Sequence, residues 1–199
     1  MSPAHVLEPT YNALRRRLVG GGWPPGYRLE AVRLAEDLGV SITPVRDALN
    51  RLTGERLVDS EPGEGFRVPR LGGSDLRATI AWHHRLMIIA VRWRAGPLPR
   101  TDIPQSQGGI EERAALVFGS IAAIAGNPEL NRAVSQTAAR LSHYRQGEAT
   151  VFPDVDAELD GIERLARDAS RAPLLEAIGR YHSRREAAAD RLAHLPKAE

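Results

Sequence analysis

Between positions 41 and 52, polar and apolar side chains recur at the spacing of an α-helix. The apolar ones form a single stripe that consists of Val45, Ala48, Leu49 and Leu52. At about 100° per residue, the opposite face then carries Thr43, Asp47 and Asn50, with Arg46 and Arg51 beside them. Guanidinium, hydroxyl and amide groups at the exposed start of a helix can hydrogen-bond to base edges in the major groove of DNA. This segment therefore indicates a nucleic-acid-reading helix, against the simpler alternative of a solvated surface helix.

The residues before this helix predict a second helix that supports it. It spans about residues 30–38 and ends at Gly39, a typical C-cap. Its apolar side consists of Leu34, Ala35 and Leu38. Ser41 or Thr43 can cap the helix that follows. Two short helices joined so closely through a glycine are typical of a helix-turn-helix.

The flanking segments complete this unit. An earlier helix with apolar residues at Tyr11, Leu14 and Leu18 ends at the glycines of 20–22. After the third helix, residues 57–60 and 65–68 form two extended segments around a turn at 61–64 that contains Pro62. A hairpin in this place is a wing, so residues 1–70 are predicted to form a winged helix-turn-helix domain.

This region resembles the GntR family of bacterial repressors over about residues 7–70. The matching stretches are Pro24-Pro25-Gly26-Tyr27-Arg28-Leu29-Glu30, Leu34-Ala35, residues 38–49, Arg51-Leu52, Glu55, Leu57-Val58 and Gly65. By this resemblance Ser41, Thr43 and Arg46 take positions that contact DNA, and Gly65 lies where the wing approaches the minor groove or the backbone. The candidate DNA-binding residues are Arg33, Ser41, Ile42, Thr43, Arg46, Asn50, Arg51, Gly65 and Arg67.

Two of these positions depart from the family pattern. Relatives usually have an arginine where this chain has Ile42, which can offer only an apolar contact, for instance to a thymine methyl group. Many relatives also have a basic residue at the position of Val32. The neighbouring Arg33 either replaces that residue or is simply solvated, and both alternatives stay open.

Residues 71–199 are predicted to form a second, all-helical domain, so the fold class is mainly α. Helices are expected near 74–95, 109–125, 128–146, 154–169 and 173–194, and no segment alternates with the period of a strand. Ser74 is expected to cap the first helix. Asn127, followed by a proline and an acidic residue, is expected to cap the third.

The second domain resembles, more weakly, the helical FCD-type domain of FadR-like members of the family, chiefly through the run Gly126-Asn127-Pro128-Glu129-Leu130. Most such domains hold a divalent metal with an aspartate and three histidines. The corresponding positions here are Ala115, Gly119, Leu159 and, with one residue inserted, His182. A lone histidine is no metal site, so we expect neither metal nor other cofactor. Recruitment of His83, His84 and His143 in a rearranged bundle is the alternative.

A small organic effector is expected to bind in a cavity among these helices. The candidate lining residues are His83, Arg85, Met87, Phe118, His143, Tyr144 and His182, with Trp82, Trp93 and Tyr181 as further possibilities. Aromatic residues at helical spacing are more often part of the core. For each of these residues, a place in the core is therefore the alternative to a place in the wall of the cavity.

Composition excludes several other classes of protein. The 199 residues include no cysteine, and neither a secretory signal pattern nor an apolar stretch long enough for a membrane span is present, which predicts a cytoplasmic protein. No phosphate-binding loop or nucleophile elbow suggests an enzyme. The sequence therefore predicts a homodimeric, ligand-responsive repressor that binds double-stranded DNA at a palindromic operator. The alternative is a winged-helix module for protein contacts.

Overall fold

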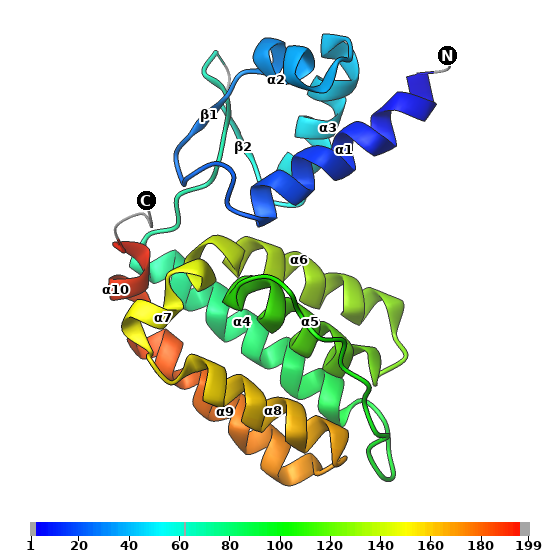
Figure 1. Ribbon diagram of the computed structural model, residues 1–199, viewed down its shortest axis with the longest axis vertical. Coiled ribbons are helices and arrows are strands. Elements are labelled where there is room, and N and C mark those ends of the chain that lie inside the picture. Colours follow the sequence, from blue (N-terminus) through cyan, green and yellow to red (C-terminus); the bar gives the residue numbers. More distant parts are fainter. Residues whose placement is uncertain (1–2, 62, 196–199) are drawn as a thin grey trace. The chain divides into compact units, whose positions relative to one another are not determined.

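The structure, a computed structural model, describes residues 3–61 and 63–195, with side chains from Val6 onward. The chain divides into two compact units, Met1–Arg70 and Leu71–Glu199, here called the N-terminal and C-terminal units (Figure 1). The predicted turn residue Pro62 lies outside the described residues. Helices make up most of both units, which confirms the mainly α fold class.

The described residues of the N-terminal unit form three helices and a small sheet. The elements are α1 (Pro3–Val19), β1 (Arg28–Leu29), α2 (Ala31–Leu38), α3 (Ile42–Gly54), β2 (Asp59–Glu61) and β3 (Gly65–Arg67). The apolar stripe predicted for α3 is completely buried and packs in the core of this unit. Its burial confirms which face of α3 points inward and leaves the opposite face to solvent.

The three strands form one antiparallel sheet in the order β1-β3-β2. β2 and β3 are the two strands of the predicted hairpin, although each is only three residues long. β1 was not expected, because two residues carry no periodicity. Its buried Leu29 lies opposite Phe66 of β3, so the sheet ties the segment before α2 to the wing.

A left-handed residue makes the turn between α2 and α3. Gly39 has φ 64° and ψ 32°, and Val40 donates its backbone N–H to the carbonyl of Ala35 at 3.0 Å. Ser41 is the N-cap residue of α3, but its side chain makes no capping hydrogen bond, and Thr43 lies inside the helix. The predicted side-chain cap is therefore wrong, whereas the predicted glycine turn is confirmed.

The described part of the C-terminal unit is a bundle of helices without strands (Figure 1). The helices are α4 (Gly73–Arg92), α5 (Ile110–Ala123), α6 (Pro128–Gln146), α7 (Glu148–Val151), α8 (Val155–Arg167), α9 (Arg171–Ala187) and α10 (Ala189–Ala193). α4 packs against α6 and α9, while α5 packs against α6 and α8 packs against α9. None of the helices in residues 3–61 and 63–195 has the length and hydropathy of a membrane span.

The predicted helix limits in this unit need three corrections. The last predicted helix is divided at Ala188 into α9 and α10, and the four-residue α7 was missed. α4 begins at Gly73 with Gly72 as its N-cap, so Ser74 is not the cap. A Cβ atom on Gly73 would lie 1.7 Å from Oδ1 of Asp190, which shows how closely α10 packs on the start of α4. The cap at the start of α6 is confirmed, since Oδ1 of Asn127 accepts two backbone N–H groups.

Candidate nucleic-acid interface and ligand cavity

The outward face of α3 presents the polar residues that the sequence analysis selected. Ser41, Thr43, Arg46 and Asn50 are exposed, and Ile42 is half-buried. The guanidinium of Arg46 has neither a hydrogen bond nor an ion pair within the described residues, and its donors face solvent. An exposed arginine near the start of a short helix, opposite a buried apolar stripe, can reach base edges in a groove.

Two other candidates flank this face. Arg33 on α2 is exposed and has no polar partner among residues 3–61 and 63–195. Gly65, at the start of β3, is exposed and adopts φ 80°, a left-handed conformation that favours glycine. Arg67 on β3 is half-buried and donates to Glu64 at 2.9 Å, so part of its donor capacity is used within the wing.

Arg51 has a structural role that the sequence analysis missed. Its Nη1 donates to Glu8 of α1 at 2.8 Å, and its guanidinium lies over the Tyr11 ring at 3.7 Å from the centroid. The hydrogen bond to Glu8 raises the pKa of Arg51. Tyr11 in turn donates its hydroxyl to Glu55 at 2.6 Å. Arg51 therefore holds α1 against α3, although its side chain remains partly exposed.

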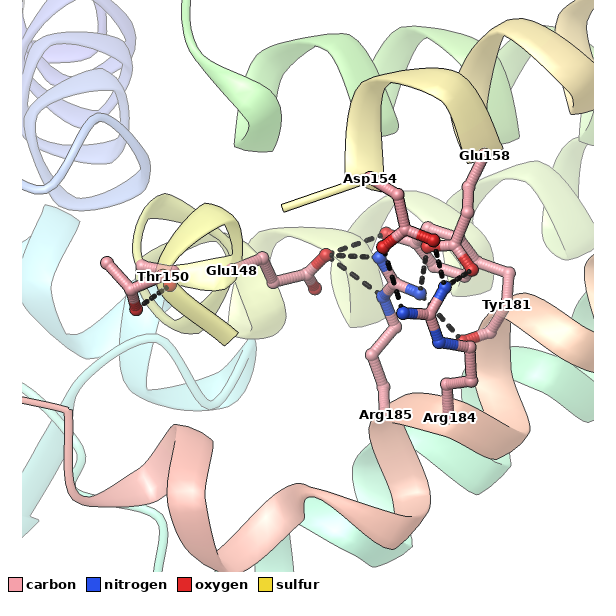
Figure 2. A network of polar contacts seen from close by, with 8 residues as sticks. Glu148, Thr150, Asp154, Glu158, Tyr181, Arg184 and Arg185 are labelled. Carbon is pink, nitrogen blue, oxygen red and sulfur yellow. Dashed lines mark hydrogen bonds and ion pairs between the residues drawn. The ribbon is translucent and has the colours of Figure 1, made fainter. Parts of the chain in front are cut away.

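A network of charged side chains in the C-terminal unit is buried at Arg185 and Glu148 and reaches the surface at Arg184 and Asp154 (Figure 2). Arg185 of α9, only 2% exposed, donates from Nε to Glu148 at 2.9 Å and from Nη1 to Glu158 at 2.8 Å. Tyr181 also donates its hydroxyl to Glu148, and burial raises the pKa of this tyrosine. Arg184 bridges Glu158 and Asp154 at the start of α8. The network fastens α9 to α7 and α8.

A small cavity lies next to this network. Its polar lining consists of Tyr144, Arg145, Glu148, Tyr181, His182 and Arg185. Its apolar lining consists of Leu76, Ile80, Leu141 and Leu192. The space holds about one water molecule in this conformation.

The cavity includes some of the predicted lining residues and excludes others. Tyr144 and His182 line it, whereas His83, Met87 and Phe118 are fully buried in the core beside it. Arg85 and Trp82 on α4 and Trp93 directly after it are exposed and are not part of the lining of this cavity. His143 is half-buried against the ring of Tyr144 and is not part of the lining.

Three charged lining residues, Arg145, Glu148 and Arg185, were missed. A signal for the first was present in the sequence, because Arg145 follows Val134, Ala138 and Leu141 on the buried stripe of α6. A charged residue on such a stripe indicates a buried site more directly than the aromatic residues that were selected.

Three histidines come together between α4 and α9. Nδ1 of His182 lies 2.7 Å from the carbonyl oxygen of Ile178 and must donate to it, so Nε2 of the same ring accepts from Nδ1 of His83 at 2.8 Å. His84 stacks on the same ring, with centroids 4.9 Å apart. The rings of His83 and His84 therefore both contact the ring of His182, but they do not converge on one atom of it. Burial holds the pKa of His83 and of His182 well below the ordinary histidine value.

The residues at the family's metal positions do not fit a metal. Ala115, Gly119 and Leu159 have no donor atoms, and both ring nitrogens of His182 are engaged by protein atoms. Within the described ranges, no group of three or more His, Asp or Glu side chains has an arrangement that could hold a metal ion.

Comparison with known proteins adds sequence and structural relatives. The family described as bacterial regulatory proteins, gntR family, matches residues 8–68. The HTH-type transcriptional regulator McbR of Escherichia coli (strain K12) is 30% identical over 177 residues, which cover 86% of this chain and 76% of McbR. The uncharacterized HTH-type transcriptional regulator YdhC of Bacillus subtilis (strain 168) is 32% identical over 66 residues, 33% of this chain and 30% of YdhC.

Two solved structures share the fold over nearly the whole chain. E. coli McbR/YncC superposes with a TM-score of 0.70 at 19% identity and covers 96% of this chain and 98% of its own. A Rhodococcus sp. RHA1 protein described as a GntR transcriptional regulator superposes with a TM-score of 0.76 at 16% identity. The superposition covers 96% of this chain and 100% of the Rhodococcus chain. The likeness in fold thus includes the helical bundle as well as the winged helix-turn-helix.

Proposed function

The chain belongs to the gntR family of bacterial regulatory proteins and is a DNA-binding transcriptional regulator, and we propose that it binds a palindromic operator as a homodimer and responds to a small organic effector. Arg46 on α3 is exposed, has no polar partner in the part of the chain that the structure describes, and lies opposite a fully buried stripe; this observation carries the proposal for DNA reading. Ser41, Thr43 and Asn50 extend this surface along α3, while Arg33 and Gly65 flank it. Arg51 contributes by holding α1 against α3.

Selection of duplexes from a random DNA library by the immobilised full-length protein tests the proposed operator. The expected product is an enriched palindrome whose half-sites are about one helical turn, ~34 Å, apart, because a two-fold protein reads a two-fold site. Recovery of sequences without a shared motif, or of a single asymmetric half-site, would contradict the proposal.

An exposed apolar stripe on α4 supports the homodimer. Trp82 and Ile89 are 51% and 41% exposed and, seven residues apart, lie on one face of the helix. Trp93, the C-cap residue directly after α4, is 52% exposed. Tryptophan is enriched where proteins contact one another, and large exposed apolar patches are uncommon on monomers. A second copy of the chain that packs its own α4 on this stripe covers it in a two-fold symmetric way.

Light scattering on the paired variant Trp82→Glu and Ile89→Glu tests this interface. The wild type is expected to be a dimer at micromolar concentration and the variant a monomer. Val32→Glu changes another exposed apolar residue, on α2, and is expected to remain dimeric. A monomeric wild type, or a variant that stays dimeric, would exclude this interface.

The hydroxyl of Tyr144 connects the cavity to the start of the C-terminal unit. Tyr144 lines the cavity, and its hydroxyl accepts the backbone N–H of Leu71 at 2.8 Å. Leu71 directly follows Arg70, the last residue of the N-terminal unit. A ligand that moves Tyr144 therefore also moves the segment that joins the units, and we propose that the response of a repressor to its effector uses this contact.

A further inference from the structure

The start of α3 carries an apolar side chain in line with the candidates for DNA reading. We propose that Ile42 contacts the C5-methyl group of a thymine in each operator half-site, about two base pairs from the base that Arg46 contacts. This inference rests on the proposed function, because it requires α3 to lie in the major groove. It adds a base preference that the proposed function leaves open.

Ile42, Arg46 and Asn50 form one row along α3. The three residues are four positions apart in a continuous helix, and at about 100° per residue such positions lie on one face. Arg46 and Asn50 are exposed, and Ile42 is half-buried. From the start of the helix onward, the row therefore offers an apolar group, a guanidinium and an amide.

The other sides of α3 are occupied by the protein itself. The apolar stripe from Val45 to Leu52 is packed in the core. On the flank opposite Arg46 lies Arg51, whose guanidinium donates to Glu8 and covers the ring of Tyr11 on α1. The side that remains for DNA is the one that carries Arg46, and Ile42 continues that side to the start of the helix.

Ile42 lies outside the fully buried core of the N-terminal unit. A single partly exposed apolar residue is ordinary on a protein surface, so exposure alone indicates nothing. The surroundings of Ile42 are what distinguish it. Ser41 and Thr43 on either side are exposed, and Ser41 does not use its hydroxyl to cap α3. An apolar group thus stands among hydroxyl groups that can hydrogen-bond to the backbone and bases of DNA.

The chemistry of the major groove defines which base an isoleucine selects. The C5-methyl group of thymine is the apolar group that base edges present there. Guanine and cytosine offer hydrogen-bond acceptors and donors, which an isoleucine side chain separates from water without replacing the lost hydrogen bonds. Contact with the methyl group instead removes apolar surface of both partners from water. Ile42 therefore favours thymine and disfavours the pairs of guanine with cytosine.

The helical rise places this thymine relative to the neighbouring contact. Ile42 and Arg46 are about 6 Å apart along the axis of α3, and successive base pairs are about 3.4 Å apart. Arginine most often contacts guanine, through O6 and N7. Each half-site is therefore expected to contain a thymine and a guanine about two base pairs apart.

Replacement of single thymines by uracil in the selected operator tests the contact, because uracil lacks only the C5-methyl group. Fluorescence anisotropy with the full-length protein measures the affinities. We expect one position in each half-site at which uracil lowers the affinity about fourfold, and about fifteenfold when both half-sites carry it, as burial of one methyl group per half-site implies. Cytosine at that position is expected to bind more weakly than thymine, and 5-methylcytosine to recover part of the loss.

Two substitutions assign the effect to one residue. Ile42→Ala is expected to bind the thymine and uracil duplexes equally. Val19→Ala shortens another half-buried aliphatic side chain, at the end of α1, and is expected to keep the difference between the two duplexes. Each comparison uses one protein sample on two duplexes, so a loss of folded protein does not mimic the result. A uracil effect of equal size in wild type and Ile42→Ala, or no uracil effect in the wild type, would overturn the proposal.

The same measurements separate this inference from the proposed function. Binding of a palindromic operator without any effect of uracil overturns the contact of Ile42 and leaves the proposed homodimeric regulator in place. Selection that recovers no shared motif contradicts both.

Discussion

Lowering the pH from about 7.5 to about 5.5 is expected to destabilise the folded protein through the buried histidine pair of the C-terminal unit. His83 and His182 are fully buried and hydrogen-bonded to each other as neutral rings. Burial, followed by the nearby Arg145 guanidinium, lowers the pKa of His83, and burial is also the main cause of the lowered pKa of His182. Both rings therefore stay neutral in the folded protein, while the unfolded chain takes up protons near pH ~6.5.

The sign and the size of the effect follow from this difference. A lowered folded-state pKa means that the unfolded state binds more protons at acid pH, so the free energy of unfolding falls as the pH decreases below about 6.5. At a pH of about 5.5, each histidine that stays neutral removes about 1.4 kcal/mol, and the pair removes about 3 kcal/mol. For a unit of this size, that is a substantial part of the total stability.

Urea unfolding followed by circular dichroism at both pH values measures this loss. The double variant His83→Met and His182→Met is expected to lose less than half as much stability as the wild type between the two pH values. The reason is that the introduced methionines take up no proton in either the folded or the unfolded state. His194→Gln removes an exposed histidine and is expected to keep the wild-type dependence. The reasoning is refuted if the double variant shows the same pH dependence as the wild type.

Three further substitutions probe single contacts. Arg185→Met leaves the buried carboxylate of Glu148 without its cationic partner and is expected to destabilise the protein by about 3–5 kcal/mol in urea unfolding. Arg180→Met, which breaks an exposed ion pair, is expected to have little effect, and equal losses would contradict the role of the buried network. Tyr144→Phe removes the hydroxyl that contacts the backbone of Leu71 at the start of the C-terminal unit. The variant is expected to bind ligand but to lose the effect of ligand on DNA affinity, and an unchanged effect would exclude transmission through this contact. Gly39→Ala introduces a side chain at φ 64° and is expected to lower stability by about 1 kcal/mol, whereas Gly54→Ala, at a helical position with open space, does not; a neutral Gly39→Ala would mean that the turn tolerates a Cβ atom.

Local periodicity accounts for the parts of the fold that the sequence predicts well. The stripe of α3 from Val45 to Leu52 repeats at the period of a helix, and every predicted member is buried. Gly39 and Asn127 mark helix ends through their own backbone or side-chain chemistry, so one sequence is enough to place them. The candidate DNA-reading face follows from the same periodicity.

The parts that sequence reasoning missed depend on contacts between distant segments. β1 is a strand only because β3, from the wing, pairs with it. His83 and His84 diverge along α4, yet both reach the ring of His182 because α9 packs against α4. Arg51 was assigned to the outward face of α3, and its contacts with Glu8 and Tyr11 depend on the path of α1. Such placements arise from tertiary packing, which helical spacing alone does not predict.

The central claim, that α3 reads DNA sequence through Arg46, is tested most directly by fluorescence anisotropy on two duplexes. One carries the operator recovered by selection, and the other has the same composition in scrambled order. Arg46→Ala is expected to lose about tenfold or more in affinity for the operator, since a bidentate base contact discriminates by about 1–3 kcal/mol, and much less for the scrambled duplex. Arg16→Ala, an exposed arginine on α1, removes the same charge and is expected to retain operator preference. Equal losses on both duplexes for Arg46→Ala, or an unchanged operator affinity, would contradict the account.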